Sequence, residues 1–163
     1  DIGALSDHVS ETGTVAGFGG GEPISGDAIW DIDCELLVPA ALGGCIDAAV
    51  GERIAAPLIV EAANGPATVE AQPVLDRRGI VVVPDILANA GGVTASYFEW
   101  AQSRQGFPWE DSVVAERLRS RMEHSFNAVW ARSQTLGVNM RTAAHVVAVE
   151  RVAAAISARG LFP

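Results

Sequence analysis

Three short runs of branched apolar residues stand in the central part of the chain, at residues 34–39, 57–61 and 80–84. The run from Ile80 to Val83 is continuous and β-branched, which is typical of a parallel strand that is covered on both faces. Segments with helical spacing follow these runs, near residues 45–54, between Thr68 and Gly79, and from about residue 90. Strands that alternate with helices in this way predict an α/β fold, namely half of a doubly wound, Rossmann-like parallel sheet of about three strands.

Helical periodicity dominates the remaining residues. A short helix is expected at residues 2–11, ended by Gly13, and a glycine-rich loop is expected at residues 17–26. C-terminal helices are expected at about 109–135 and 139–159. We therefore expect a single domain over residues 1–163, with the sheet within about 1–106 and C-terminal helices within about 107–163. The first of these helices has an apolar stripe that predicts a core face, formed by Val114, Leu118, Met122, Phe126, Val129 and Trp130. Further residues expected to pack are Val69, Val74 and Leu75 in the helix capped by Thr68, and Val146, Val149, Val152 and Ile156 in the last helix.

The composition excludes several classes of function. The net charge is -9, with 20 acidic residues against 11 basic ones, which argues against a nucleic-acid partner. No apolar run is long enough for a membrane helix and no signal sequence opens the chain, so we expect a cytoplasmic protein with no membrane partner. All 11 basic residues are arginine, so the chain supplies no lysine as a general base. Because a helical pattern begins at once with no preceding strand, we expect a piece of a longer protein.

The glycine-rich loop does not match a dinucleotide-binding fingerprint. A G-x-G-x-x-G pattern counted from Gly17 meets Glu22 in place of the third glycine, and Pro23 follows where a helix should continue. A metal site is not indicated either, because the three histidines stand apart and Cys34 and Cys45 lack a C-x-x-C spacing. We find no nucleophile beside a base and no carboxylate pair at a useful spacing.

The loops that follow the three predicted strands carry small and amide residues: Ala40, Ala41, Asn64, Gly65, Asn89 and Gly91. Because parallel strands end at the same edge of a sheet, these loops should meet there. Asn89 is predicted to cap the helix that begins at about residue 90, where Gly91 and Gly92 would let another molecule approach the backbone. Asparagine offers a donor and an acceptor, which suits the amide and ribose of a cofactor. The alternative is that Asn-Gly simply forms a turn.

Five runs of residues resemble one family, in its order and over nearly the whole chain. They are ETGTVAGF at 11–18, LVPAAL at 37–42, EAANGP at 61–66, VPDILANAGGVTASYFEW at 83–100 and MRTAA at 140–144. The sequence resembles the glutamate/leucine/phenylalanine/valine dehydrogenase family, and most closely its glutamate dehydrogenases. The resemblance implies reversible oxidative deamination of glutamate to 2-oxoglutarate and ammonia, with NAD or NADP as cofactor. It also implies a homo-oligomer, a hexamer, for the whole enzyme.

The same resemblance implies roles for six residues: Ala40, Ala41, Asn64, Asn89, Val93 and Ser96. The first three would line the nicotinamide-ribose side of the cofactor site, and Asn89 would bond the nicotinamide amide. Val93 and Ser96 would face the substrate. The Ser96 hydroxyl would bind the side-chain carboxylate of glutamate, and this favours glutamate over leucine, phenylalanine or valine. Without the resemblance, Ser96 is an ordinary helix residue.

Parts of the family pattern have no counterpart in the chain. They are the glycine fingerprint, the residue that separates NAD from NADP, and the substrate domain with its catalytic lysine and aspartate. We therefore expect the C-terminal part of a glutamate dehydrogenase that is inactive on its own. Smaller departures are Gly19 and Gly20 where proline is usual, Gly43 and Gly44 where bulkier polar residues are usual, and Ala62 where glycine is usual. Two alternatives stay open: a stand-alone, non-catalytic nucleotide-binding or interaction module, and a branched-chain amino acid dehydrogenase.

Overall fold

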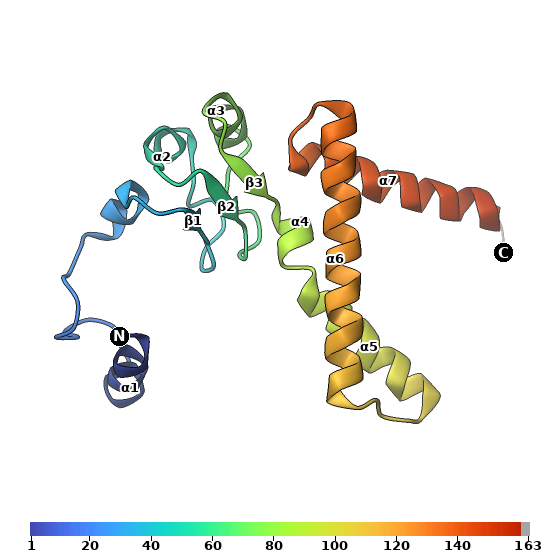
Figure 1. The fold of residues 1–163 in the computed structure, drawn as a ribbon, viewed down its shortest axis with the longest axis horizontal. Coiled ribbons are helices and arrows are strands. Elements are labelled where there is room, and N and C mark those ends of the chain that lie inside the picture. The colour runs from blue at the N-terminus through green and yellow to red at the C-terminus, as the bar shows by residue number, and fades with distance from the viewer. Residues whose placement is uncertain (161–163) are drawn as a thin grey trace.

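Three parallel strands form one sheet in the computed structural model, which describes residues 1–160. The strands β1 (Leu36–Leu37), β2 (Leu58–Val60) and β3 (Val81–Val83) lie side by side in that order (Figure 1). The predicted parallel sheet is confirmed, but each strand is shorter than its apolar run. Prolines lie at the ends of these runs, at positions 39, 57 and 84, and a proline has no N–H with which to extend the ladder.

One face of the sheet is covered by two helices. Leu37, Ile59 and Val82 lie in register across the three strands. They pack in one apolar core with residues of α2 (Ala48–Arg53) and α3 (Ala71–Arg77), which lie on the same side of the sheet (Figure 1). Ile59, on the central strand, has 0% of its surface exposed. This face therefore holds the main core of the described residues.

The opposite face of the sheet is partly open. Leu36, Leu58 and Val81 lie in register on this face, and the exposed fractions of Leu36 and Val81 are 47% and 40%. The expectation that the third strand is covered on both faces is therefore wrong at Val81. The reason is that residues 1–160 place α2 and α3 against one side only, whereas a parallel sheet normally has a layer on each side.

Four helices follow the third strand: α4 (Asp85–Ala88), α5 (Gly91–Gln105), α6 (Asp111–Leu136) and α7 (Met140–Arg159). The long helix α6 runs past the β3 side of the sheet (Figure 1). The helix α7 packs on α6 near the C-terminal end of α6. A second apolar cluster joins α4, α6 and α7 through five buried residues: Leu87, Val129, Met140, Ala143 and Ala144. The predicted helices are confirmed, but the separate turn of α4 was not predicted by the periodicity.

The apolar stripe of α6 is not the core face that the sequence predicts. Among its six residues only Val129 is buried, and Phe126 and Trp130 are 40% and 43% exposed. On α7 three of the residues expected to pack are also exposed: Val149, Val152 and Ile156. The C-terminal half of α7 projects from the rest of the chain (Figure 1), so no other element of residues 1–160 covers it.

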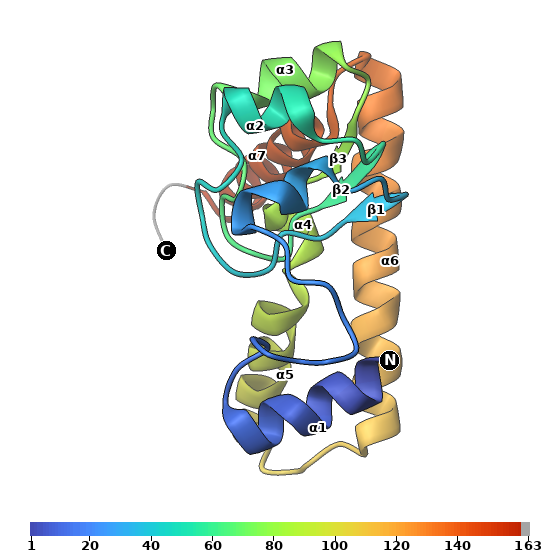
Figure 2. The same cartoon turned by 90° about the vertical axis from the view of Figure 1, so that its left-hand side faces the viewer.

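The N-terminal segment lies apart from the sheet. The predicted first helix is confirmed as α1 (Ile2–Thr12), and it ends at Gly13, whose φ of 74° is in the left-handed region. Irregular residues lead from α1 to a 3-10 helix, η1 (Gly26–Asp31), which the sequence did not predict. Figure 2 shows α1 beside its own loop and away from the three strands. No helix within residues 1–160 has both the length and the apolar character that crossing a membrane requires.

Two valines provide a matched test of this core. Val82 is 5% exposed on β3, whereas Val69, which the sequence predicts to pack, is 86% exposed ahead of α3. We expect Val82→Ala to lower the free energy of unfolding by about 2 kcal/mol, because it removes two buried methyl groups and leaves a cavity. Val69→Ala should change it by less than about 0.5 kcal/mol. Urea unfolding followed by circular dichroism measures both values, and equal losses would contradict the assigned core.

Candidate functional site

The three loops that leave the carboxyl ends of the strands lie against one another. The backbone N–H groups of Ala62 and Ala63 donate to the carbonyl oxygen of Pro39, at 3.1 and 2.8 Å. The N–H of Gly44 donates to the carbonyl oxygen of Gly65 at 2.7 Å. The sequence predicted that the three loops meet at one edge of the sheet. These backbone contacts join the loops after β1 and β2, and Asn89 joins the loop after β3 to them through the carbonyl oxygen of Ala62 at 3.3 Å.

Gly43 has no side chain at the point where the first loop approaches the second. A Cβ atom on Gly43 would lie 2.8 Å from the carbonyl oxygen of Asn64, which is closer than a side-chain carbon packs. The next residue, Gly44, has a φ of 67°, a conformation that residues with a Cβ rarely adopt. The two glycines that depart from the family pattern therefore allow the first loop to lie directly on Asn64.

Asn64 and Asn89 are joined by a hydrogen bond. Asn89 Nδ2 donates to Asn64 Oδ1 at 2.7 Å and to the carbonyl oxygen of Ala62 at 3.3 Å. The expectation that Asn89 caps the following helix is wrong. The residue before α5 is Ala90, which makes no side-chain cap, and Asn89 instead closes the single turn of α4. Asn89 lies at the end of α4, and its side-chain amide donates to Ala62 and Asn64 in the loop after β2 rather than to the backbone of α5.

These bonds fix the polarity of the asparagine pair, Asn64 and Asn89. Both hydrogens of Asn89 Nδ2 are engaged, so Asn89 Oδ1 is left as an acceptor. The Oδ1 of Asn64 already accepts, so Asn64 Nδ2 is left as a donor. Neither of these two atoms bonds to another group within residues 1–160. The asparagine pair can therefore accept one hydrogen bond and donate one, which is the pattern that a primary carboxamide complements.

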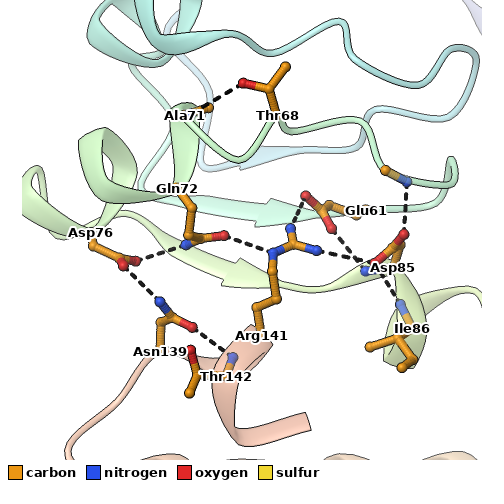
Figure 3. Close-up of polar contacts among 11 residues, drawn as sticks. Glu61, Thr68, Ala71, Gln72, Asp76, Asp85, Ile86, Asn139, Arg141 and Thr142 are labelled. Atoms are coloured by element: carbon orange, nitrogen blue, oxygen red, sulfur yellow. Dashed lines mark hydrogen bonds and ion pairs between the residues drawn. The ribbon is translucent and has the colours of Figure 1, made fainter. Parts of the chain in front are cut away.

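A buried ion pair lies beside this edge of the sheet (Figure 3). Glu61 follows β2 and has an exposed fraction of 0%. Its Oε1 accepts from Arg141 Nη2 at 2.5 Å, and its Oε2 accepts from the backbone N–H of Asp85 at 2.9 Å. Arg141 comes from the first turn of α7 and also donates to Asp85 Oδ1 at 3.2 Å and to Gln72 Oε1 at 2.9 Å. The buried carboxylate thereby has a cation and a hydrogen-bond donor in place of water.

Asp85 connects the second loop to the third. Its Oδ2 accepts from the N–H of Gly65 at 2.8 Å, and its Oδ1 accepts from the N–H of Ile86 at 2.8 Å. Desolvation raises the pKa of Asp85, but these two N–H donors and the Arg141 charge outweigh it and hold the pKa below its ordinary value of 3.8. Asp85 is therefore charged at neutral pH while it links the two loops.

Sequence reasoning missed four residues of this edge: Glu61, Gln72, Asp85 and Arg141. One signal was present, since Glu61 ends a buried apolar run and a buried carboxylate needs a cation. The chain has 11 arginines, and Arg141 lies 80 positions from Glu61. Spacing along the sequence therefore could not select Arg141 as the partner.

A model of the Glutamate/Leucine/Phenylalanine/Valine dehydrogenase family matches residues 1–160. The chain belongs to this family. Three curated dehydrogenases of the family are similar in sequence. Glutamate dehydrogenase of Thermotoga maritima is 48% identical, NADP-specific glutamate dehydrogenase A1 of Halobacterium salinarum is 47% identical, and NAD-specific glutamate dehydrogenase of Staphylococcus aureus is 44% identical. The matches cover 100%, 100% and 98% of this chain but 39%, 40% and 38% of these dehydrogenases.

A solved dehydrogenase of the family has the same fold. The chain matches the leucine-bound crystal structure of hetero-hexameric glutamate dehydrogenase from Thermus thermophilus with a TM-score of 0.89 and 31% identity, over 100% of this chain and 38% of that chain. The family resemblance seen in the sequence is thus confirmed. The chain spans about two fifths of the length of the dehydrogenases that it matches.

The structure places the expected site residues in the loops after the strands and on the helix α5. Ala40 and Ala41 are exposed in the first loop, next to the asparagine pair's own loops. Val93 and Ser96 are exposed on α5, one helical turn apart, and Val93 is 69% exposed. Asn64 and Asn89 are in contact. The roles in cofactor and substrate binding that the sequence suggests for these six residues stay predictions. Within residues 1–160 no cluster of His, Cys, Asp and Glu side chains could hold a metal ion.

The lowered pKa of Asp85 predicts a pH dependence of stability. A carboxyl group whose pKa is lower in the folded state stabilises that state above its unfolded pKa, and the contribution is lost as the pH falls through the folded pKa. We expect Asp85→Asn to lower the free energy of unfolding at pH 6 and to lower it less at pH 3. Urea unfolding at several pH values measures this difference.

The control for this experiment is Asp7→Asn, at an exposed position on α1. It removes the same charge without removing a link between loops. If the difference between the protein and its Asp85→Asn variant stayed constant from pH 6 to pH 3, the ionised form of Asp85 would not be the one that links the loops.

Proposed function

We propose that this chain is the C-terminal part of a glutamate dehydrogenase, in which it forms the nicotinamide side of an NAD or NADP site and one wall of the glutamate site. Residues 1–106 would belong to the cofactor-binding domain, and residues 107–163 would form the C-terminal helices that follow it. The observation that carries this proposal is the asparagine pair at the carboxyl edge of a parallel sheet, in a chain 44% to 48% identical to three glutamate dehydrogenases. Ligands of open α/β sheets bind outside this edge.

The hydrogen-bonding groups at the edge fit a nicotinamide carboxamide. Asn89 Oδ1 would accept from the amide nitrogen of the cofactor, and Asn64 Nδ2 would donate to its carbonyl oxygen. Ala40 and Ala41, with their small exposed side chains, would leave room for the nicotinamide ribose. NAD or NADP bound there would accept a hydride from the Cα of glutamate.

Val93 and Ser96 would face the substrate in this arrangement. Both are exposed on the part of α5 that follows Asn89. The Ser96 hydroxyl would donate to the side-chain carboxylate of glutamate, and this bond would hold the Cα toward the cofactor. The overall reaction converts glutamate, the oxidised cofactor and water to 2-oxoglutarate, ammonium, the reduced cofactor and a proton. The chain contains no lysine, so other residues of the protein would supply a lysine base.

The proposed site would accept either NAD or NADP. The NADP-specific dehydrogenase of Halobacterium salinarum and the NAD-specific one of Staphylococcus aureus are similar to this chain at 47% and 44% identity. The nicotinamide end, which this chain would contact, is the same in NAD and NADP. We also propose that the protein is cytoplasmic and forms a hexamer. The hetero-hexameric glutamate dehydrogenase of Thermus thermophilus supports the hexamer.

The proposal predicts glutamate-dependent reduction of NAD or NADP by the complete protein encoded by the gene to which this chain belongs. The purified 163-residue chain should show none, because it contains no lysine to act as the base. The absorbance of the reduced cofactor measures both reactions. Activity of the 163-residue chain would refute the proposal that residues outside this chain supply the base. A complete protein that binds the cofactor but oxidises no amino acid would favour a non-catalytic nucleotide-binding module.

Ser96→Ala tests the choice of substrate. We expect kcat/KM for glutamate to fall about tenfold to a hundredfold, because a hydrogen bond to a charged group is lost. The kcat/KM for leucine, which has no side-chain carboxylate, should stay within about twofold. Ser103→Ala, at another exposed position of α5, is the matched control. A wild-type protein that prefers leucine, with Ser96→Ala unchanged, would indicate a branched-chain amino acid dehydrogenase instead.

A further inference from the structure

Arg141 is the one cation that contacts the buried carboxylate of Glu61 within residues 1–160. The side chain of Glu61 has 0% exposure and that of Arg141 has 23%. All three types of guanidinium nitrogen are used, since Nη2 donates to Glu61, Nη1 to Asp85 and Nε to Gln72. A lysine has a single nitrogen and could not reach three acceptors on separate elements at once.

The contacts of Arg141 join segments that are far apart in the sequence. Arg141 lies 80 positions from Glu61, 56 from Asp85 and 69 from Gln72. A second chain of bonds supports the first turn of α7, because Asn139 Nδ2 donates to Asp76 Oδ2 at 2.7 Å and Gln72 Nε2 donates to Asp76 Oδ1 at 2.8 Å (Figure 3). The start of α7 is thereby fixed against α3 and the ends of β2 and β3.

Asp85 carries this restraint to both members of the asparagine pair. Asp85 Oδ2 accepts from the N–H of Gly65, the residue after Asn64. Asp85 also begins α4, and the single turn of α4 ends at Asn89. The hydrogen bond from Asn89 to Asn64 closes the ring of contacts. A displacement of Asp85 would therefore move Asn64 and Asn89 relative to each other.

We propose that Arg141 is a positioning residue, which sets the spacing of Asn64 and Asn89 for the cofactor by holding Asp85 and Glu61 from the first turn of α7. This inference rests on the proposed function, because it concerns the affinity of the same site. It makes the C-terminal helix α7 part of the cofactor site although no residue of α7 belongs to the asparagine pair. A merely structural ion pair would affect the stability of the protein without a selective effect on the cofactor.

The first experiment compares Arg141→Lys with Arg53→Lys in the complete protein. Arg53 also bridges two carboxylates, with Nη1 2.8 Å from Asp27 and Nη2 2.5 Å from Asp31, but it contacts η1 rather than the loops. We expect Arg141→Lys to raise the KM for the cofactor about tenfold or more, since small misplacements of binding groups have effects of this size. The KM for glutamate should stay within about twofold, and Arg53→Lys should leave both KM values unchanged.

The second experiment separates positioning from charge balance. In the double variant Glu61→Gln with Arg141→Met, no buried charge is left without a partner, so folding should be retained even where Arg141→Met alone fails to fold. The amide that replaces the carboxylate at position 61 can still accept from the N–H of Asp85, but Asp85 has lost its contact with Arg141. We expect the dissociation constant for the reduced cofactor, measured by its fluorescence, to remain about tenfold above that of the wild-type protein.

The possible outcomes identify which idea fails. A double variant with the wild-type dissociation constant would show that Arg141 only neutralises Glu61, and it would overturn the inference. An Arg141→Lys variant with an unchanged KM for the cofactor would overturn it as well. A wild-type complete protein that neither binds nor reduces NAD or NADP would instead overturn the proposed function, and this inference with it.

Discussion

The burial of one carboxylate is the constraint on which the carboxyl edge of the sheet depends. Glu61 has no exposed surface, and an ionised group taken out of water costs several kcal/mol unless a cation and hydrogen-bond donors replace the solvent. Arg141 and the backbone of Asp85 replace it, so α7 must lie against the ends of β2 and β3. Such a pair adds little net stability, because desolvation offsets the attraction. Its consequence is geometric, since any arrangement that separates α7 from β2 leaves the charge of Glu61 without a partner.

The described residues satisfy their buried polar groups but leave large apolar surfaces uncovered. No buried side-chain nitrogen or oxygen within residues 1–160 lacks a hydrogen-bond partner. In contrast, Leu36 and Val81 on the sheet and Val149 on α7 are exposed by 47%, 40% and 67%. Apolar burial is the main favourable term in folding, so these faces are where further contacts would stabilise the protein most. The polar groups of the described residues are therefore paired among themselves, whereas their apolar faces are still available for further contacts.

The sequence predicted those features of the fold that depend on neighbouring residues. Three parallel strands, the helices after them and the meeting of their loops follow from local apolar runs and from the geometry of parallel sheets. The features that were missed depend on distant residues. The sequence predicts that Asn89 caps a helix, but the Asn89 amide instead donates to Asn64, which lies 25 positions earlier. The stripe of α6 reads as core, yet whether Trp130 is buried depends on which elements lie against it, and periodicity carries no information about that.

The polarity of the asparagine pair follows from one backbone carbonyl. The oxygen of Ala62 accepts from Asn89 Nδ2, and this turns the Asn89 amide so that its second hydrogen meets Asn64 Oδ1. The remaining acceptor and donor then stand on Asn89 and Asn64 respectively, and neither amide can rotate without losing a hydrogen bond. In the proposed site this order suits a carboxamide, which donates with its nitrogen and accepts with its oxygen. A carboxylate in the same place would set a negative oxygen against Asn89 Oδ1, and the two acceptors would repel. In the proposed site, the edge of the sheet would therefore favour nicotinamide over nicotinic acid, because the carbonyl group of Ala62 sets the direction of the Asn89 amide.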